Sequence, residues 1–206
     1  MSADTEQIIT EEKPAEEKPA EEKPVAKPAP KPAAKPTPKP VELPAFEKSI
    51  SDKIVEKFGD KIEVEFVKEN RVGIKVNRDD IHDVAEFIRD GLNYDHVESV
   101  SGVDYPQDKE IEVVYHIGSY SDSSLAKQLL VLATRAQREE NPIPGKDATK
   151  LPTLRDIFYS VEFHEREVFE MFGVYFTGHP DNRRLLLPED WADLPPLRKD
   201  FAIKGR

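Results

Sequence analysis

The sequence predicts an α+β fold in which a mixed sheet of about five strands carries helices on one side. Two runs of alternating apolar and polar residues are separated by a short polar turn, which is typical of a β-hairpin. Apolar residues at helical spacing precede and follow this hairpin, and three further apolar runs of strand length come after them. The expected order is therefore α-β-β-α-β-β-β, followed by a helical and extended C-terminal segment.

The first helix and the hairpin follow each other closely in the sequence. Apolar residues recur at helical spacing over residues 46–58, and Gly59 provides a stop. Apolar and polar residues then alternate over 62–66 and again over 72–76. This alternation predicts two strands, which are joined by a turn over residues 68–71.

A second helix and three more strands complete the predicted sheet region. Apolar residues at helical spacing predict that this helix starts at about Asp79 and ends before Gly91. The three strands are expected over residues 97–105, 111–117 and 129–136. The last of them is ambiguous, because residues 126–138 could equally form a helix.

The C-terminal third is expected to follow a proline-containing loop over residues 141–145. Thr153 has the side chain of a helix N-cap, which predicts a short helix ending near Tyr159. A longer helix carries the charged residues discussed below and ends at Gly173, and residues 174–176 read as a short extended segment.

The first forty residues differ in composition from the rest of the chain. They contain nine of the 18 prolines, and they repeat Glu-Glu-Lys-Pro-Ala and then Lys-Pro pairs. Frequent proline and the lack of large side chains leave little to bury, which predicts a disordered tail over residues 1–40 and one domain over residues 41–206. The tail is either a solubilising segment or a tether that docks on a partner.

Composition excludes several classes of function. The chain has no cysteine, so it offers no thiolate for catalysis and no cysteine ligands for an iron–sulfur cluster. Residues 41–206 carry 33 acidic and 23 basic side chains, a net charge of −10 that disfavours binding to nucleic acid. No apolar run approaches membrane-spanning length and no signal peptide is evident, so we expect a cytoplasmic protein.

The most informative segment combines a charged helix with a leucine run. Glu165, Arg166 and Glu167 open the charged part of the helix, and Arg166 lies one turn from both Glu162 and Glu170. The simplest interpretation of these charges is a solvent-exposed ladder of ion pairs.

Glu165-Arg166-Glu167 is followed by Glu170, His179, Arg183 and Leu185-Leu186, and then by runs at 187–191 and 196–201. This order resembles the signature of the C-subunit family of NADH:quinone oxidoreductase, respiratory complex I. The resemblance is dense over about 151–201 and looser over 42–150. This family also supplies a chain to archaeal dehydrogenases that oxidise a reduced deazaflavin and to related membrane-bound hydrogenases. Two positions depart mildly from the pattern, since Phe163 stands where tryptophan is common and Glu170 where aspartate is common. The residues that carry the resemblance, or that we expect to form an interface, are Glu165, Arg166, Glu167, Glu170, Gly173, His179, Arg183, Arg184, Leu185, Leu186, Trp191, Arg198 and Lys199.

The resemblance implies a cofactor-free structural subunit in the peripheral arm of a complex I-like enzyme, on the cytoplasmic face of the membrane. Such a subunit packs on the large catalytic subunit and helps to hold the iron–sulfur subunits. The iron–sulfur clusters, the quinone or phenazine acceptor and the nicotinamide or deazaflavin donor would all belong to partners, and electron transfer would be coupled to ion translocation.

The resemblance also implies roles for the signature residues. The acidic residues and Arg166 would form an ionic network, and the later basic residues and His179 would anchor an interface. The run from Arg183 to Phe201 is broken by prolines and cannot bury its leucines in a regular element, so residues 183–206 are expected to dock on a partner. Trp191 serves either this interface or packing within the chain.

Two other hypotheses remain open from the residues themselves. His164 and Glu167 have the spacing of one pair of metal ligands on a helix, which would fit a free-standing metal-dependent enzyme. Alternatively, the protein is an interaction module that acts through its tail. No glycine-rich nucleotide-binding motif or hydrolase motif supports a further activity.

Overall fold

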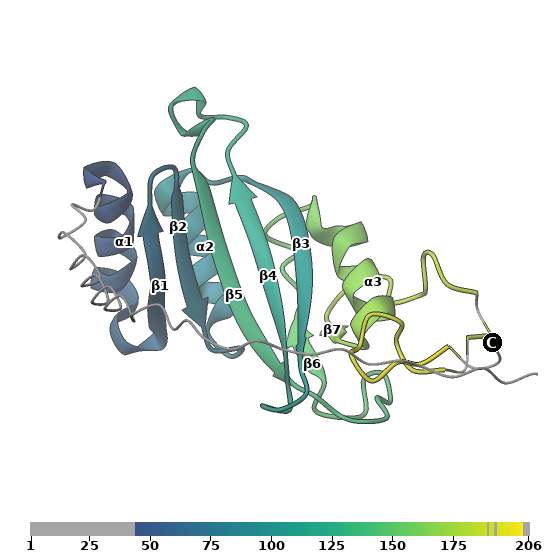
Figure 1. The fold of residues 1–206 in the computed structure, drawn as a ribbon. Coiled ribbons are helices and arrows are strands. Elements are labelled where there is room, and N and C mark those ends of the chain that lie inside the picture. The colour runs from purple at the N-terminus through teal and green to yellow at the C-terminus, as the bar shows by residue number, and fades with distance from the viewer. Residues whose placement is uncertain (1–43, 189, 192, 204–206) are drawn as a thin grey trace, which may run out of the picture. The chain divides into compact units, whose positions relative to one another are not determined.

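The computed structural model describes residues 44–188, 190, 191 and 193–203 and shows an α+β fold built on one mixed sheet. The tail expected over residues 1–40 lies outside the described residues. The strands run in the order β1-β2-β5-β4-β3, with β2 and β5 parallel and the other neighbours antiparallel (Figure 1). The strands are β1 (Ile62–Lys68), β2 (Arg71–Val76), β3 (His96–Tyr105), β4 (Glu110–Gly118) and β5 (Leu129–Gln137).

The predicted mixed sheet of five strands is confirmed, and the ambiguous segment at residues 126–138 forms a strand. This strand, β5, lies in the middle of the sheet, so its backbone is hydrogen-bonded on both sides. Leu130 and Leu132 are fully buried on one face, while Val131 and Ala133 point to the other. Because side chains on both faces of this central strand are buried, its apolar run is continuous, and periodicity alone could not assign it to a strand or a helix.

Three helices pack on the face of the sheet that carries the core. They are α1 (Ala45–Phe58), α2 (Ile81–Leu92) and α3 (Val161–Phe172), and α2 is seen behind the sheet in Figure 1. Alternate residues of β4, from Ile111 to Ile117, are fully buried against them. Two short 3₁₀ helices, η1 (Gly59–Lys61) and η2 (Ser123–Leu125), lie in the connections.

The first two helices differ from the prediction in detail. Phe46 of α1 is exposed, whereas Glu47 is buried and accepts hydrogen bonds from the Asn70 N–H at 2.7 Å and from Gln128 at 3.0 Å. Helix α2 continues past Gly91 and ends before Asn93, which adopts the left-handed conformation with φ of 61°. Asparagine tolerates that conformation, so the helix can end without glycine.

The prediction of a short helix between Thr153 and Tyr159 is wrong. The Phe158 N–H bonds to the Leu154 carbonyl at 2.8 Å and closes a single turn, and the next helix in the described chain is α3. The Thr153 hydroxyl donates to Glu165 and also accepts from the Arg155 N–H, which stabilises a turn.

A second, small sheet forms near this turn. Strand β6 (Lys150–Pro152), which periodicity did not reveal, pairs in parallel with β7 (Tyr175–Thr177). Strand β7 confirms the predicted extended segment after α3. From Gly178 onward the described residues form neither helix nor strand.

Candidate functional site

Helix α3 is the platform of the candidate site. It ends at Gly173, which has φ of 80° and donates its N–H to the Phe169 carbonyl at 2.8 Å. A β-carbon at this glycine would lie 3.0 to 3.1 Å from Pro142, Pro195 and Arg198. Glycine therefore allows both the turn and the close packing of the later chain against the helix end.

The side chain of Glu170 binds the backbone N–H groups of the leucine run, residues 185–187. The Glu170 carboxylate is 4% exposed and accepts the N–H groups of Leu185 at 3.0 Å, Leu186 at 2.9 Å and Leu187 at 3.0 Å. Convergent backbone N–H groups form a favourable site for an anion. Because the backbone faces inward, the side chain of Leu186 remains 63% exposed and that of Leu185 42% exposed. We call residues 183–187 the leucine loop.

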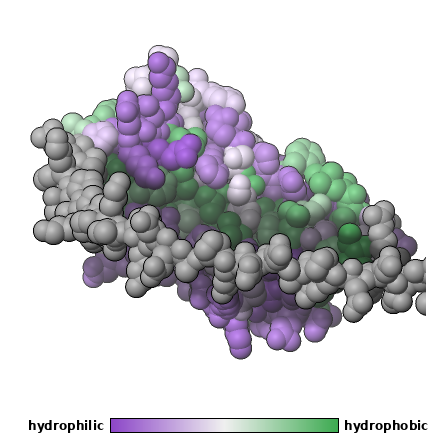
Figure 2. Space-filling model, in the orientation of Figure 1, coloured by the Kyte–Doolittle hydropathy of each residue, from purple (hydrophilic) through white to green (hydrophobic). Residues whose placement is uncertain are grey.

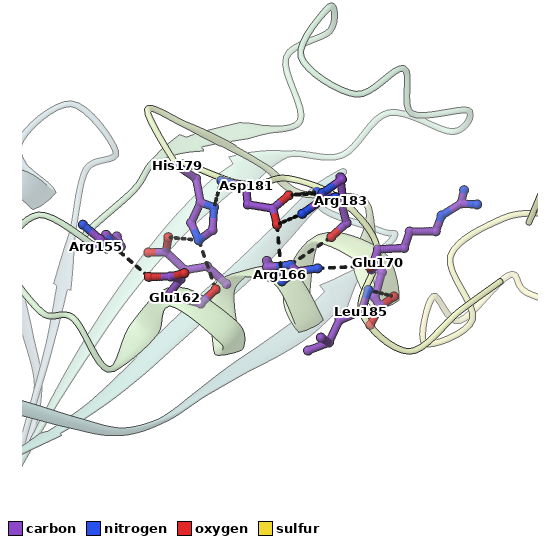
Figure 3. A network of polar contacts seen from close by, with 10 residues as sticks. Arg155, Glu162, Arg166, Glu170, His179, Asp181, Arg183 and Leu185 are labelled. Atoms are coloured by element: carbon purple, nitrogen blue, oxygen red, sulfur yellow. Dashed lines mark hydrogen bonds and ion pairs between the residues drawn. The ribbon is translucent and has the colours of Figure 1, made fainter. Parts of the chain in front are cut away.

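Arg166 reaches the same loop through carbonyl groups, as Figure 3 shows. Its guanidinium donates to the carbonyls of Arg183 at 3.0 Å and Arg184 at 3.1 Å, and it lies 3.5 Å from the Asp181 carboxylate. The expected ladder along the helix is therefore replaced by contacts across to the loop. Glu162 instead pairs with Arg155 at 3.1 Å. With a side chain only 12% exposed, Arg166 is not part of a solvated surface ladder.

His179 and Asp181 fold the beginning of the loop back onto α3. The His179 ring contacts the Glu162 carbonyl through Nε2 at 3.0 Å, and its Nδ1 accepts the Asp181 N–H at 3.0 Å. These partners assign a ring proton to Nε2, because Nδ1 accepts a hydrogen bond. Hydrogen bonds from Arg183 to the Asp181 carboxylate lower the pKa of that carboxyl well below its ordinary value. The Arg183 side chain is otherwise 86% exposed.

Glu165 points into the core. Its fully buried carboxyl accepts the Leu154 N–H at 2.9 Å, the Tyr115 hydroxyl at 3.2 Å and the Thr153 hydroxyl, and the His179 Nε2 lies 4.0 Å away. Burial raises the pKa of Glu165 to about 7, because the three hydrogen bonds that favour the charged form offset only part of the desolvation.

Glu165→Gln should remove a pH dependence of stability. A raised folded-state pKa means that the stabilisation from the protonated carboxyl is complete below about pH 4.5 and is lost as pH rises through about 7. The shift corresponds to about 3 kcal/mol. We expect the variant to unfold at higher urea than the natural chain at pH 8 but similarly at pH 4.5. Glu162→Gln on the same helix serves as the control, and parallel pH profiles for the natural chain and Glu165→Gln would refute this assignment.

Polar contacts of Arg184 and Arg198 hold the segment after the leucine loop. Arg184 donates to the carbonyls of Pro188 at 3.1 Å and Trp191 at 2.8 Å. The Arg198 guanidinium is buried, and it donates to the Phe172 carbonyl at 2.7 Å and to the Glu139 carbonyl. Arg198 therefore anchors this segment to its own chain, at the end of α3.

Trp191 and Lys199 lie in the same segment. The Trp191 Nε1 donates to the Leu194 carbonyl at 3.2 Å, and its ring lies 6.0 Å from that of Phe201. The backbone N–H of Lys199 donates to Asp104 at 2.9 Å, while its side chain is exposed. Trp191 is half-buried, so intramolecular contacts account for part of its surface and leave the rest exposed.

The remaining candidates do not join this arrangement. Glu167 is exposed on α3, and His164 is half-buried beside it. Among residues 44–188, 190, 191 and 193–203, no three histidine, aspartate or glutamate side chains come together as metal ligands. In the described part of the chain, His164 and Glu167 thus lack the third ligand that a catalytic ion needs.

Sequence reasoning missed several residues that support the site. The Arg138 guanidinium pairs with Asp104 at 2.6 Å and with Asp200 at 2.7 Å, and both members of the first pair are buried. Tyr115 occurs at an inward position of an alternating strand, so its hydroxyl required a buried partner. Asp104 and Arg138 gave no such signal, because charged residues near strand ends are ordinarily solvated.

Exposed apolar side chains gather at this end of the molecule. Figure 2 shows hydrophobic surface at its right-hand end, over α3 and the loop that follows. The exposed large apolar residues from α3 and its flanking segments are Tyr159, Phe163, Leu185, Leu186, Leu197 and Ile203. An apolar surface next to buried polar anchors is typical of a site for binding another protein.

The known proteins that this chain resembles are subunits of dehydrogenases or oxidoreductases. Residues 74–206 match the family described as respiratory-chain NADH dehydrogenase, 30 Kd subunit. The C subunit of the F(420)H(2) dehydrogenase of Methanosarcina mazei is 34% identical over 155 residues, which cover 75% of this chain and 90% of that protein. The C/D subunit of the NADH-quinone oxidoreductase of Phocaeicola vulgatus is 34% identical over 128 residues, which cover 62% of this chain and 22% of that protein.

A solved structure shares the fold. It is a chain of the membrane-bound sulfane sulfur reductase, an archaeal respiratory membrane complex. The two chains are 28% identical and superpose with a TM-score of 0.59, over 76% of this chain and 86% of the other. None of the helices in the described residues has the length and apolar composition that crossing a membrane requires.

Proposed function

The chain belongs to the family of the 30 kDa subunit of respiratory-chain NADH dehydrogenase, the C-type subunit of complex I-like oxidoreductases, and we propose that it is a structural subunit that docks through its α3 end. In this role it performs no chemistry. It packs on the large catalytic subunit of the peripheral arm and helps to hold the iron–sulfur subunits in position for electron transfer coupled to ion translocation.

The observation that carries this proposal is the way α3 holds the leucine loop. Glu170 takes three backbone N–H groups and Arg166 takes two backbone carbonyls, so the loop backbone is fixed while its leucine side chains face outward. A rigid loop that presents apolar side chains loses little conformational entropy on binding. The two buried carboxylates of α3, Glu165 and Glu170, accept hydrogen bonds from the chain itself, so they do not face a partner. The charged signature supports an interface indirectly, because Glu170 positions the loop whose leucine side chains remain exposed.

The redox groups are proposed to lie in partner subunits. The chain has no cysteine, so cysteine-ligated iron–sulfur clusters need other polypeptides. The electron donor is NADH or a reduced deazaflavin, as the names of the relatives indicate for those proteins, and the acceptor is a quinone or a phenazine. We place the subunit at the cytoplasmic face of the membrane, attached through the complex.

The partner on the leucine loop is proposed to be the large catalytic subunit, which we call the D-type subunit. The relative from Phocaeicola vulgatus combines the letters C and D in the name of one chain. Parts of one polypeptide remain close together, which favours the D-type subunit as the neighbour of the C-type subunit where the two are separate chains.

The double variant Leu185→Asp and Leu186→Asp should lose assembly while remaining folded. Two charges on exposed side chains cost little in the isolated subunit but cannot be desolvated in an interface. We would purify the tagged full chain from its native membranes, identify co-purifying subunits by mass, and measure the melting temperature of the subunit alone.

The matched control is Val55→Asp, which changes a 42% exposed apolar residue on α1. It should assemble like the natural chain. Recovery of dehydrogenase subunits with the double variant would contradict the docking role of the leucine loop. Absence of dehydrogenase subunits from the natural chain would contradict the proposed function as a whole.

A further inference from the structure

A cleft of about 380 Å³ lies beside the leucine loop, and the proposed docking of that loop gives the cleft no role. It is formed by the loop after β5, the end of α3 and the segment around Trp191. Six of its eleven lining residues are apolar, and the other five are Asn141, Glu170, Gly173, Arg184 and Asp193. The apolar lining residues are Pro142, Pro144, Phe169, Trp191, Leu194 and Pro195.

Several polar groups of the cleft are already hydrogen-bonded within the chain. Glu170 accepts the leucine-loop N–H groups, and Arg184 donates to the carbonyls of Pro188 and Trp191. The Trp191 Nε1 donates to Leu194. The cleft therefore combines rings and aliphatic groups with polar groups that are already bonded within the chain, so it fits a proline ring or an aliphatic side chain flanked by polar residues better than a charged metabolite.

Two prolines of the cleft wall pack closely on the end of α3. Pro142 and Pro195 both pack around Gly173, where a β-carbon would approach each of them to within 3.0 to 3.1 Å. Proline fixes the backbone, and Arg198 anchors the segment behind the cleft by donating to the Phe172 carbonyl. A preformed cleft requires little ordering when it binds.

The charged residues near the cleft indicate which residues of a partner should flank the bound apolar side chain. Asp193 lines the cleft together with Glu170 and Arg184, and the exposed Glu140 and Asp190 immediately precede the lining residues Asn141 and Trp191. Residues 41–206 as a whole carry a net charge of −10. Lysine or arginine beside the bound apolar residue would complement this rim.

We propose that the cleft binds an extended segment of the large D-type subunit, with a proline or aliphatic side chain between Phe169 and Trp191 and basic residues on either side. This inference rests on the proposed function. The partner is chosen because the cleft is lined by Arg184 of the leucine loop and by Glu170, which binds that loop, and so continues the proposed docking surface. The name of one relative also joins C and D in a single chain.

Photo-crosslinking in the assembled complex tests the occupant. The crosslinking amino acid p-benzoylphenylalanine would be placed at Asn141, which is exposed and lines the cleft, and separately at Leu186 and at Val55. We expect Asn141 to crosslink to a peptide of the D-type subunit that has a proline or aliphatic residue next to lysine or arginine. Val55 should give no product with that subunit.

Filling the cleft gives a second measurement. Asn141→Trp should reduce the amount of D-type subunit retained at least tenfold without lowering the melting temperature of the isolated chain, because the Asn141 side chain is exposed. Ile143→Trp is the control, since this exposed residue belongs to the same loop but does not line the cleft.

The outcomes separate this inference from the proposed function. If the D-type subunit co-purifies and crosslinks to Leu186, but not to Asn141, the docking role stands and the cleft inference is wrong. The same conclusion follows if Asn141→Trp retains the partner as well as Ile143→Trp does. If no D-type subunit co-purifies with the natural chain, the proposed function itself fails.

Discussion

Asp104→Ala is expected to lower the free energy of unfolding by about 3 to 5 kcal/mol. Asp104 is 2% exposed, and its carboxylate accepts Arg138 at 2.6 Å and the Lys199 N–H at 2.9 Å. Although burial opposes ionisation, these hydrogen bonds hold the pKa of Asp104 below its ordinary value. Alanine would leave the Arg138 guanidinium buried with less compensation and would release the segment that follows Arg198.

Urea denaturation of the full chain measures this loss. Asp108→Ala is the matched control, because Asp108 lies in the turn after β3 with a side chain 58% exposed and a 4.0 Å ion pair to Arg135. An exposed pair contributes at most about 1 kcal/mol. Equal stabilities of the two variants would show that the Asp104 contacts do not hold the C-terminal segment in place.

Glu170→Ala is expected to release the leucine loop. The substitution removes the acceptor of three backbone N–H groups, and bonds to a charged group contribute about 1.5 to 3 kcal/mol each, although their effects do not add fully. We expect amide hydrogen exchange at residues 185–187 to become at least tenfold faster, and the variant to lose the D-type subunit on purification.

Glu167→Ala is the control that isolates the role of the Glu170 carboxylate. Glu167 lies on the same helix three residues earlier and is exposed, so its loss should leave both exchange and assembly unchanged. Unchanged protection of residues 185–187 in Glu170→Ala would mean that the loop is held mainly by Arg166. If both variants lose assembly, the loss arises from the changed charge of the helix and not from the changed position of the leucine loop.

The signature residues divide into two kinds by their surroundings. Glu165, Arg166, Glu170 and Arg198 act inside the chain, where they bond to backbone groups or to buried hydroxyls. Leu185 and Leu186 face outward and are the residues that a partner would contact first. The interpretation of the charges as a solvated ladder is therefore wrong for Arg166 and Glu170, which both serve the loop.

Periodicity in the sequence predicted most of the fold, because local patterns of burial repeat within each element. The hairpin of β1 and β2, the three later strands and the helices α1, α2 and α3 all appear near their predicted positions. The end of α3 at Gly173 was also predictable, since a left-handed residue there is decided by local backbone sterics. The lack of cysteine and the order of the signature residues likewise needed no structure.

Contacts between distant parts of the chain were not predictable in this way. Strand β6 is three residues long and exists because β7 pairs with it, so no local period marks it. Arg198 binds carbonyls of Glu139 and Phe172, which lie 59 and 26 residues away in the chain. The order of residues establishes which side chains are charged or apolar and which elements they occupy. Which backbone groups remain unpaired, and therefore which charged side chain bonds to them, depends on how the loops pack, and only the folded chain fixes that.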